Sequence, residues 1–232
     1  MTASRIKPEE LERYKRRRRI ATPLRMLGGL LLFSLPAGGP QRFYLEPVGI
    51  VFGILMLAQG ILERWIQAPD TGGKKRDSAS IAVAWIGYAL TFIIAIADWF
   101  WIRPHFSLWS WSWFWVGAGL ALVVAGQVLR FVAIRTLGAF FTATVRVHAD
   151  HKVIQHGLYS LVRHPSYTGL LLLSLGYVTL FGSPFGYAAF LLFALPGMIN
   201  RIQVEERALV RELGDEYKKY RRRVKRLIPY FY

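Results

Sequence analysis

Residues 81–102 of this chain read IAVAWIGYALTFIIAIADWFWI, an apolar run that carries one charged side chain, Asp98, near its end. A helix of about 20 mostly apolar residues is long enough to cross the hydrocarbon core of a bilayer. The run therefore predicts a membrane-spanning helix, with Asp98 placed where an acid can reach the interface. It also predicts the fold class, an all-α polytopic membrane protein.

The apolar pattern extends in both directions from this run. Further spans are predicted at residues 22–36, which is short, and at residues 44–65 and 108–134. The stretch at residues 169–199 is too long for one simple span, and Gly182-Ser183-Pro184 interrupts it with turn-forming residues. We expect two short helices folded as a hairpin, and so about six membrane-embedded helices, four spans plus the hairpin.

The charge of the chain supports a membrane location and indicates the orientation. Lys and Arg number 30 against 14 Asp and Glu, a net charge of +16, while 53% of the residues are hydrophobic. The basic clusters at residues 13–19, 74–76 and 218–226 flank apolar segments, which favours anionic lipid headgroups over nucleic acid as their partner. Because basic loops stay on the cytoplasmic side, both termini are expected there. The membrane is expected to be that of a prokaryotic cell rather than the endoplasmic reticulum.

Three regions are expected along the chain. Residues 1–20 form a basic cytoplasmic tail, residues 21–136 form transmembrane scaffold helices, and residues 137–232 form the catalytic region. In the last region, apolar residues recur every three or four positions from Val204 to Leu227, which predicts an amphipathic helix on the membrane surface. Gly49 and Gly53 form a small-xxx-small pair that indicates either a dimer seam or, as we favour, close packing within one chain.

Polar side chains that a membrane protein does not keep without reason gather at residues 148–167. The histidines there are His148, His151, His156 and His164. Four histidines suggest a metal site, but their spacing fits no common zinc signature and the Arg and Lys residues among them repel a cation. The chain contains no cysteine, which also excludes thiolate ligands and cysteine nucleophiles. We therefore predict no metal.

A second polar group follows the hairpin. Arg201 and Glu205 are four residues apart on a predicted helix, so they share one face near the membrane boundary, while Glu206 is rotated by about 100°. Arg preceding Glu is the weaker order for an ion pair within a helix. Burying such charges without a partner or ligand is expensive, so Arg201, Glu205 and Glu206 are candidate catalytic residues.

The sequence around these two polar groups resembles that of a known protein family. Residues 157–169, Gly-Leu-Tyr-Ser-Leu-Val-Arg-His-Pro-Ser-Tyr-Thr-Gly, resemble the signature of the isoprenylcysteine carboxyl methyltransferases. The family pattern continues with an Arg, a Glu four residues later, a Gly-x-x-Tyr-x-x-Tyr segment and a late Pro. Here those positions are Arg201, Glu205, Gly214, Tyr217, Tyr220 and Pro229. The resemblance covers about residues 137–232.

This resemblance implies an integral membrane methyltransferase that uses S-adenosylmethionine, held by the loop and hairpin rather than by a Rossmann domain. Transferred position by position, the cofactor contacts are His151, Lys152, Val153, Ile154, Tyr159, His164, Pro165, Ser166, Tyr167 and Glu205. Arg201 is expected to bind the substrate, a lipophilic acceptor such as the carboxylate of an isoprenylcysteine or a similar lipid-like acid. The family's eukaryotic members have a cofactor-binding Gln shortly before the loop, where this chain has Thr144.

Three other functions stay open at this stage. A phospholipid or lipid-amine N-methyltransferase needs a proton acceptor, a role for Glu205 or Glu206. NADPH-dependent sterol-type reductases resemble the Arg-His-Pro segment and the closing Ile228-Pro229-Tyr230, although their usual Asp is replaced by Leu170 here. A non-catalytic membrane adaptor would use only the basic tails, to bind anionic lipid.

Overall fold

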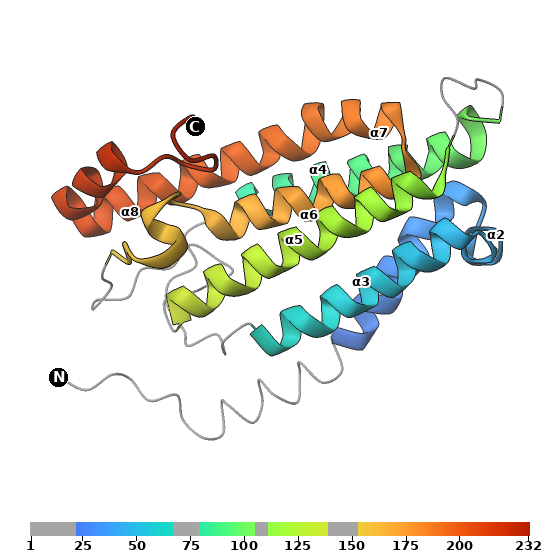
Figure 1. The fold of residues 1–232 in the computed structure, drawn as a ribbon, viewed down its shortest axis with the longest axis horizontal. Helices are drawn as coiled ribbons and strands as arrows, with labels where there is room; N and C mark the ends of the chain where they lie inside the picture. The colour runs from blue at the N-terminus through green and yellow to red at the C-terminus, as the bar shows by residue number, and fades with distance from the viewer. Residues whose placement is uncertain (1–21, 67–78, 105–110, 139–152) are drawn as a thin grey trace.

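The computed structural model describes residues 22–66, 79–104, 111–138 and 153–232, and over those ranges the chain is all-α, as predicted. The helices run roughly side by side along the long axis of the molecule (Figure 1). Within the described ranges, the one isolated β-bridge pairs Val162 with Lys225 in parallel. The predicted basic tail and the basic loop at residues 74–76 lie outside the described residues.

Three helices of the described chain are long and apolar enough to cross a membrane. The first is α4 (Ala79–Ala97), continued by the π-helical turn η2 (Asp98–Ile102), and the second is α5 (Trp113–Leu137). The third combines α7 (Pro184–Ala189), the π-helical turn η5 (Phe190–Ala194) and α8 (Leu195–Arg223). The first two coincide with predicted spans, whereas the third begins in the predicted hairpin and continues beyond it.

Shorter apolar helices complete the bundle. They lie at Thr22–Ala37, at Pro47–Glu63 within α3 (Pro47–Ile66), and at Pro165–Phe181, which is α6. Short elements connect them: the 3-10 turns η1 (Leu35–Ala37) and η4 (Gly157–Ser160), and α2 (Pro40–Leu45). The span predicted at residues 44–65 therefore begins slightly later than expected, because Pro47 starts a new helix after the extended residue Glu46.

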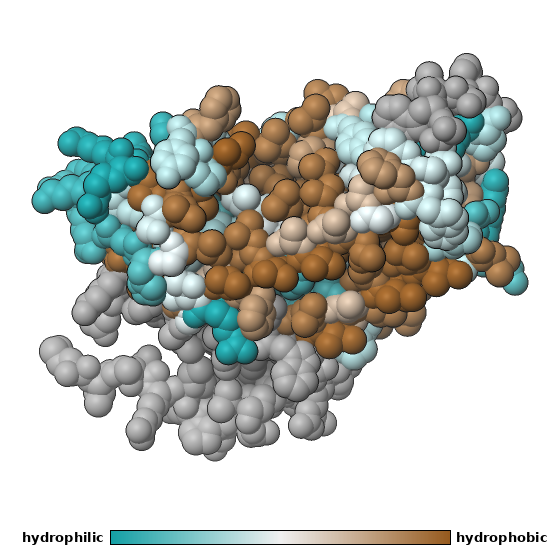
Figure 2. All heavy atoms as spheres, viewed as in Figure 1, coloured by the Kyte–Doolittle hydropathy of each residue, from teal (hydrophilic) through white to brown (hydrophobic). Residues whose placement is uncertain are grey.

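The surface of the bundle matches an apolar solvent. Large apolar side chains such as Ile54, Trp85, Phe114, Val124 and Leu192 are exposed on α3, α4, α5 and η5. Figure 2 shows apolar side chains over the middle of the visible face and hydrophilic ones gathered at the end where α8 terminates. Helices satisfy their own backbone hydrogen bonds, so such a surface is stable in lipid.

The predicted turn between the hairpin helices is confirmed. Gly182 ends α6 in the left-handed conformation (φ 53°), and Ser183 begins α7 by accepting a hydrogen bond from the Gly186 backbone N–H at 2.8 Å. The Ser183 hydroxyl also donates to Oδ2 of Asp98 at 2.5 Å, which fixes the turn to the end of α4. Asp98 is thus buried against the hairpin instead of reaching the interface as predicted.

The prediction of a short second hairpin helix is wrong. That arm continues from Pro184 through the charged residues after Ile199, even though Pro196 and Gly197 lie within it. The π-helical turn η5 lies just before Pro196, whose ring cannot fit a regular helix interior. The separate amphipathic helix predicted at residues 204–227 is instead the end of this long helix, bent at Gly214 (φ 56°, ψ −129°).

Glycines bring α5 and α6 into close contact. A Cβ atom at Gly126 would lie 2.6 Å from the carbonyl oxygen of Gly169, and the converse distance is also 2.6 Å. The same arrangement recurs at 2.8 Å between Gly119, seven residues before Gly126, and Gly176, seven residues after Gly169. In lipid, helix association depends on such close backbone approach. The contact sets the register of α6 and so the position of the motif at its beginning.

The other glycine pair packs within the chain, as favoured from the sequence. A Cβ atom at Gly49 would lie 2.0 Å from the carbonyl oxygen of Phe43, and one at Gly53 would lie 2.8 Å from the ring of Tyr44. Both neighbours belong to α2 of the same chain. The pair therefore serves the turn from α2 into α3.

We predict that Gly126→Ala destabilises the protein by about 1 to 3 kcal/mol, the usual effect of adding a methyl group to a packed core. The matched control is Gly117→Ala on the same helix, where a Cβ atom meets nothing within 4 Å. Thermal unfolding of the purified protein in detergent gives the comparison. Equal unfolding midpoints for the two variants would contradict the close α5–α6 contact.

Candidate functional site

The segment before α6 is held against α8 by the backbone that follows α8. The backbone N–H of Arg163 donates to the carbonyl of Lys225 at 2.7 Å, and that of His164 donates to the carbonyl of Arg226 at 3.0 Å. The Tyr220 hydroxyl donates to the carbonyl of Tyr159 at 2.6 Å. These bonds place the histidine motif directly over the charged part of α8.

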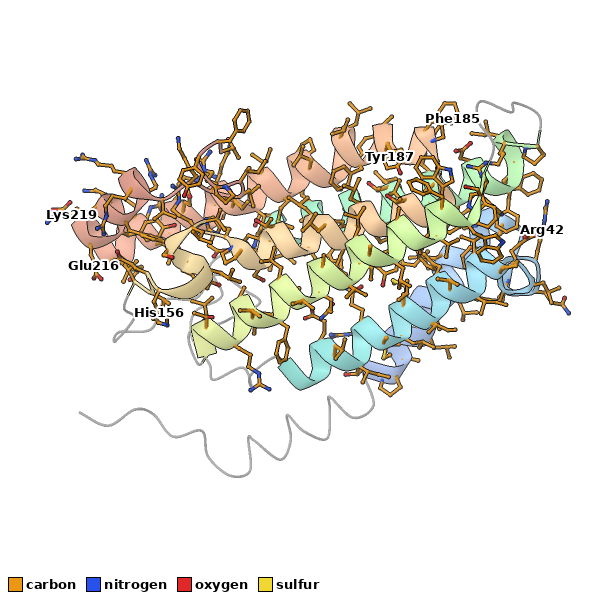
Figure 3. The ribbon with its side chains drawn as sticks, viewed as in Figure 1. Arg42, His156, Phe185, Tyr187, Glu216 and Lys219 are labelled. Carbon is orange, nitrogen blue, oxygen red and sulfur yellow. The ribbon has the colours of Figure 1, made fainter. Side chains whose placement is uncertain are left out.

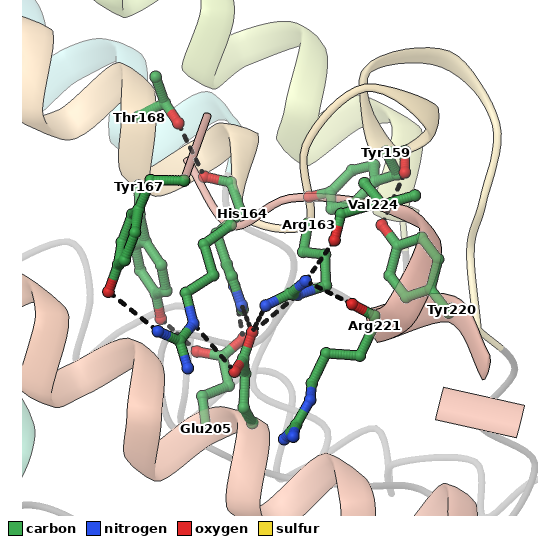
Figure 4. Close-up of polar contacts among 12 residues, drawn as sticks. Tyr159, Arg163, His164, Tyr167, Thr168, Glu205, Tyr220, Arg221 and Val224 are labelled. Atoms are coloured by element: carbon green, nitrogen blue, oxygen red, sulfur yellow. Dashed lines mark hydrogen bonds and ion pairs between the residues drawn. The ribbon is translucent and has the colours of Figure 1, made fainter. Parts of the chain in front are cut away.

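Glu206 is the centre of the polar cluster. Its side chain is 2% exposed and accepts hydrogen bonds from Nε of Arg163 at 2.8 Å and from Nε of Arg226 at 3.2 Å (Figure 4). Nε2 of His164 lies 3.3 Å from the carboxylate atom Oε1 that Arg163 also contacts. A buried carboxylate is expensive unless it is paired and hydrogen-bonded, and here both oxygens are engaged.

Glu205 occupies a different environment from its neighbour. It is 25% exposed, accepts a hydrogen bond from the Tyr167 hydroxyl, and lies 3.9 Å from Nδ1 of His164. The rings of His164 and Tyr167 stack with centroids 5.6 Å apart. Adjacent residues on a helix point about 100° apart, which is why one carboxylate is buried and the other stays accessible.

Arg201 lies one turn earlier on the same helix. The residue is 3% exposed, and its Nη1 donates to the hydroxyl of Ser80 on α4 at 3.1 Å. Ser80 belongs to the first turn of α4, at the end of that helix nearest the charged cluster. Arg201 therefore lies at the junction of α4 and α8, one helical turn from Glu205.

The other predicted contacts surround this group. Pro165 is the first residue of α6, and Ser166 accepts a hydrogen bond from Nη1 of Arg130 at 2.7 Å. Tyr159 is buried, and burial raises the pKa of its phenol above the ordinary value, so the ring stays neutral. Val153 and Ile154 are half-buried in the irregular segment before η4, whereas His151 and Lys152 lie outside the described residues.

Some residues of the cluster were not singled out from the sequence. Arg163 and Arg226 neutralise Glu206, and Arg130 forms an ion pair with Glu63 of α3 while holding Ser166. A usable signal existed for the last pair, because Glu63 and Arg130 each stand in an apolar helix, where a charge is expensive. The tail residue Arg226 had no such signal.

The two ends of the bundle carry different side chains. His156, Glu216 and Lys219 lie at the end with the polar cluster, and Arg42, Phe185 and Tyr187 lie at the other (Figure 3). The last turn of α8 adds Arg221, Arg222 and Arg223 to the cluster's end. The candidate site is therefore at the more basic end of the molecule.

Comparison with known proteins gives one family. The model of the isoprenylcysteine carboxyl methyltransferase family matches residues 119–211. Over 145 residues the chain is 30% identical to protein-S-isoprenylcysteine O-methyltransferase B of Arabidopsis thaliana, a match that covers 62% of this chain and 74% of that protein. It is 37% identical over 113 residues to a rice protein (Oryza sativa subsp. indica) named "Probable protein-S-isoprenylcysteine O-methyltransferase".

The rice match covers 48% of this chain and 59% of that relative, so this chain spans little more than half of the rice protein. A solved structure, that of a eukaryotic intramembrane Ras methyltransferase, resembles this fold with a TM-score of 0.54 at 23% identity. That likeness covers 88% of this chain and 74% of the solved one. The fold of this chain is therefore that of an integral, multi-pass membrane protein.

We predict that Glu206→Gln destabilises the protein by about 3 to 5 kcal/mol, because removing one member of a buried ion pair leaves the other uncompensated. The control is Glu216→Gln, at an exposed position on the same helix, where no change is expected. Chemical unfolding in detergent measures the difference. If both variants unfold at the same denaturant concentration, the Glu206 cluster does not stabilise the fold.

Proposed function

We propose that this chain, which belongs to the isoprenylcysteine carboxyl methyltransferase family, transfers a methyl group from S-adenosylmethionine to the carboxylate of a lipophilic acceptor. The observation that carries the proposal is the convergence of His164, Tyr167 and Glu205 beside the buried Arg201. Prenylated proteins are the acceptors that the family name implies. We propose a prenylated protein as the acceptor on that basis.

The residues beside Glu205 fit a cationic, amino-acid-bearing cofactor. The Glu205 carboxylate is partly accessible and suits an ammonium group, while the Tyr167 face suits a sulfonium through cation–π contact. Val153, Ile154, Tyr159, His164, Pro165 and Ser166 would complete the pocket, with His151 and Lys152 from the segment before it. When bound, S-adenosylmethionine supplies an electrophilic methyl carbon.

Glu206 is assigned a positioning role. Both of its oxygens are occupied by Arg163, His164 and Arg226, so it is not free to accept a proton. By holding His164 it orients the ring that stacks on Tyr167. This revises the expectation that Glu206 belongs to the catalytic residues.

Arg201 is assigned to the acceptor. A carboxylic acid with a pKa of about 3.5 is ionised at neutral pH, so the reaction needs no general base. The guanidinium of Arg201 would hold the carboxylate by charge-assisted hydrogen bonds and leave one oxygen directed at the methyl carbon. Transfer would replace the S–C bond with an O–C bond and leave the electron pair on sulfur, so the charges of both reactants would disappear.

A cavity gives room for a lipophilic acceptor. It has a volume of about 680 Å³ and lies between the helix at Thr22–Ala37, α3, α4 and α6. Its lining is mostly apolar and includes Tyr88 and Ser174, whose buried hydroxyl oxygens have no hydrogen-bond partner among the described residues. Glu63, also in the lining, pairs with Arg130, which contacts Ser166 of the motif. This chain of contacts connects the cavity with the proposed cofactor site.

The proposal includes the orientation in the membrane. Six apolar helices, four spans and the α6–α7 hairpin, would place both termini and the basic end with Lys219 in the cytoplasm. The membrane is that of a prokaryotic cell. Residues 1–20 would serve as a tail that binds anionic headgroups, residues 21–136 as the scaffold, and residues 137–232 as the catalytic region.

We predict that the purified protein binds S-adenosylmethionine and not NADPH in a calorimetric titration. Glu205→Gln should weaken cofactor binding about 10- to 100-fold, as expected for the loss of a hydrogen bond to a charged group. Arg201→Ala should keep cofactor affinity and lose turnover, whereas Glu216→Gln should change neither.

NADPH binding alone would support a sterol-type reductase, and the absence of binding by both molecules would support a non-catalytic adaptor. Full turnover by Arg201→Ala would show that Arg201 does not hold the acceptor.

We also predict that Ala89→Phe, which places a ring in the cavity lining, raises the KM for a long-chain acceptor by roughly tenfold or more. Cofactor affinity should not change. The control is Ala125→Phe, on the exposed face of α5. An unchanged KM in Ala89→Phe would mean that the acceptor does not enter this cavity.

A further inference from the structure

The residues after α8 end in an exposed apolar turn. The backbone N–H groups of Leu227 and Ile228 donate to the carbonyl of Tyr232 at 2.7 and 2.9 Å, which closes the turn. Tyr230 is 91% exposed and Phe231 is 82% exposed. Tyr230 also adopts a left-handed backbone conformation (φ 65°), which residues other than glycine rarely take. The turn presents aromatic rings where no described part of the chain covers them.

The depth of this turn follows from the contacts of Leu227. Leu227 is buried in a cluster with Tyr88 of α4 and with Met198 and Ile202 of α8. Its carbonyl accepts a hydrogen bond from the hydroxyl of Thr168, in the first turn of α6, at 3.0 Å. Figure 1 shows the C-terminal segment returning along α8 instead of extending beyond it. The turn therefore lies at the edge of the apolar part of the bundle.

The flanking residues have the composition of a membrane interface. Lys225 is exposed immediately before the turn, and Arg221, Arg222 and Arg223 are exposed at the end of α8. Aromatic rings are enriched at the level of the headgroups, and Lys and Arg beside them bind anionic lipid. A water-soluble partner would have to approach a surface that continues into the lipid-facing side of the bundle.

We propose that Ile228, Tyr230 and Phe231 form an interfacial foot that inserts into the headgroup region of an anionic bilayer on the side of the candidate site. The foot is continuous with a strap, residues 224–227, that closes over the site. Within the strap, Arg226 bonds Glu206 through Nε and the Tyr232 hydroxyl through Nη1, the latter at 2.9 Å. Lipid contact at the foot thus holds Arg226 on the buried carboxylate.

Spin labelling tests the insertion directly, because the chain has no cysteine and a single introduced one is labelled uniquely. Phe231→Cys and, separately, Tyr230→Cys are labelled with a nitroxide and placed in phosphatidylcholine vesicles containing phosphatidylglycerol. Collision rates with oxygen and with a water-soluble nickel chelate should place both labels roughly 5 to 10 Å into the boundary between headgroups and acyl chains. The control is Glu216→Cys, which should contact the chelate freely.

Labels at 230 and 231 that are as accessible to the chelate as the label at 216 would overturn the proposal. The measurement needs no substrate, so its outcome is independent of whether the chain transfers methyl groups.

The connection to the strap has its own test. Hydrogen exchange in the same vesicles should become at least several-fold faster at the His164 amide, which bonds the carbonyl of Arg226, in a Tyr230→Ser and Phe231→Ser double variant. The control is Val124→Ser, an exposed lipid-facing position on α5, where exchange should match the unmodified protein. Unchanged exchange in the double variant would show that the foot does not hold the strap.

Discussion

The burial of Glu206 constrains the end of the molecule that carries the candidate site. A carboxylate with 2% exposure must be neutralised, and its partners come from two places in the chain, Arg163 and His164 before α6 and Arg226 after α8. Satisfying it therefore requires the histidine motif to lie on α8 and the chain after α8 to turn back. The bend at Gly214 precedes that return. With Glu206 fixed, the preceding residue, Glu205, is directed towards Tyr167 and partial solvent access.

Close helix packing carries this arrangement into the membrane. Gly126 and Gly169 allow α5 and α6 to touch backbone to backbone, so Arg130 on α5 reaches Ser166 at the beginning of α6. Arg130 is in turn paired with Glu63 on α3, beside the cavity. The proposed acceptor cavity and the proposed cofactor site are thereby linked through polar side chains of α3, α5 and α6.

Most of the fold could be predicted from the sequence, as could several residues of the candidate site. Span lengths and the turn residues at Gly182-Ser183-Pro184 were sufficient to place the apolar helices. In lipid, each segment must be long enough to cross the bilayer and must form its own backbone hydrogen bonds, so each can be recognised separately. The continuity of the helix from Pro184 to Arg223 was missed, since a change from apolar to charged composition does not end a helix. The partners of Glu206 were missed because Arg226 reaches it only through the returning tail, a tertiary contact without a local pattern.

If the chain transfers methyl groups to a carboxylate, the chemistry of the product reveals it. The protein in vesicles is supplied with S-adenosylmethionine labelled in its methyl group and with a farnesylated cysteine whose carboxylate is free. A methyl ester releases labelled methanol in mild alkali, whereas a methylated amine does not. We expect alkali-labile label in the wild type and its loss in Arg201→Ala. Label that resists alkali, or equal labelling in the variant, would contradict this expectation.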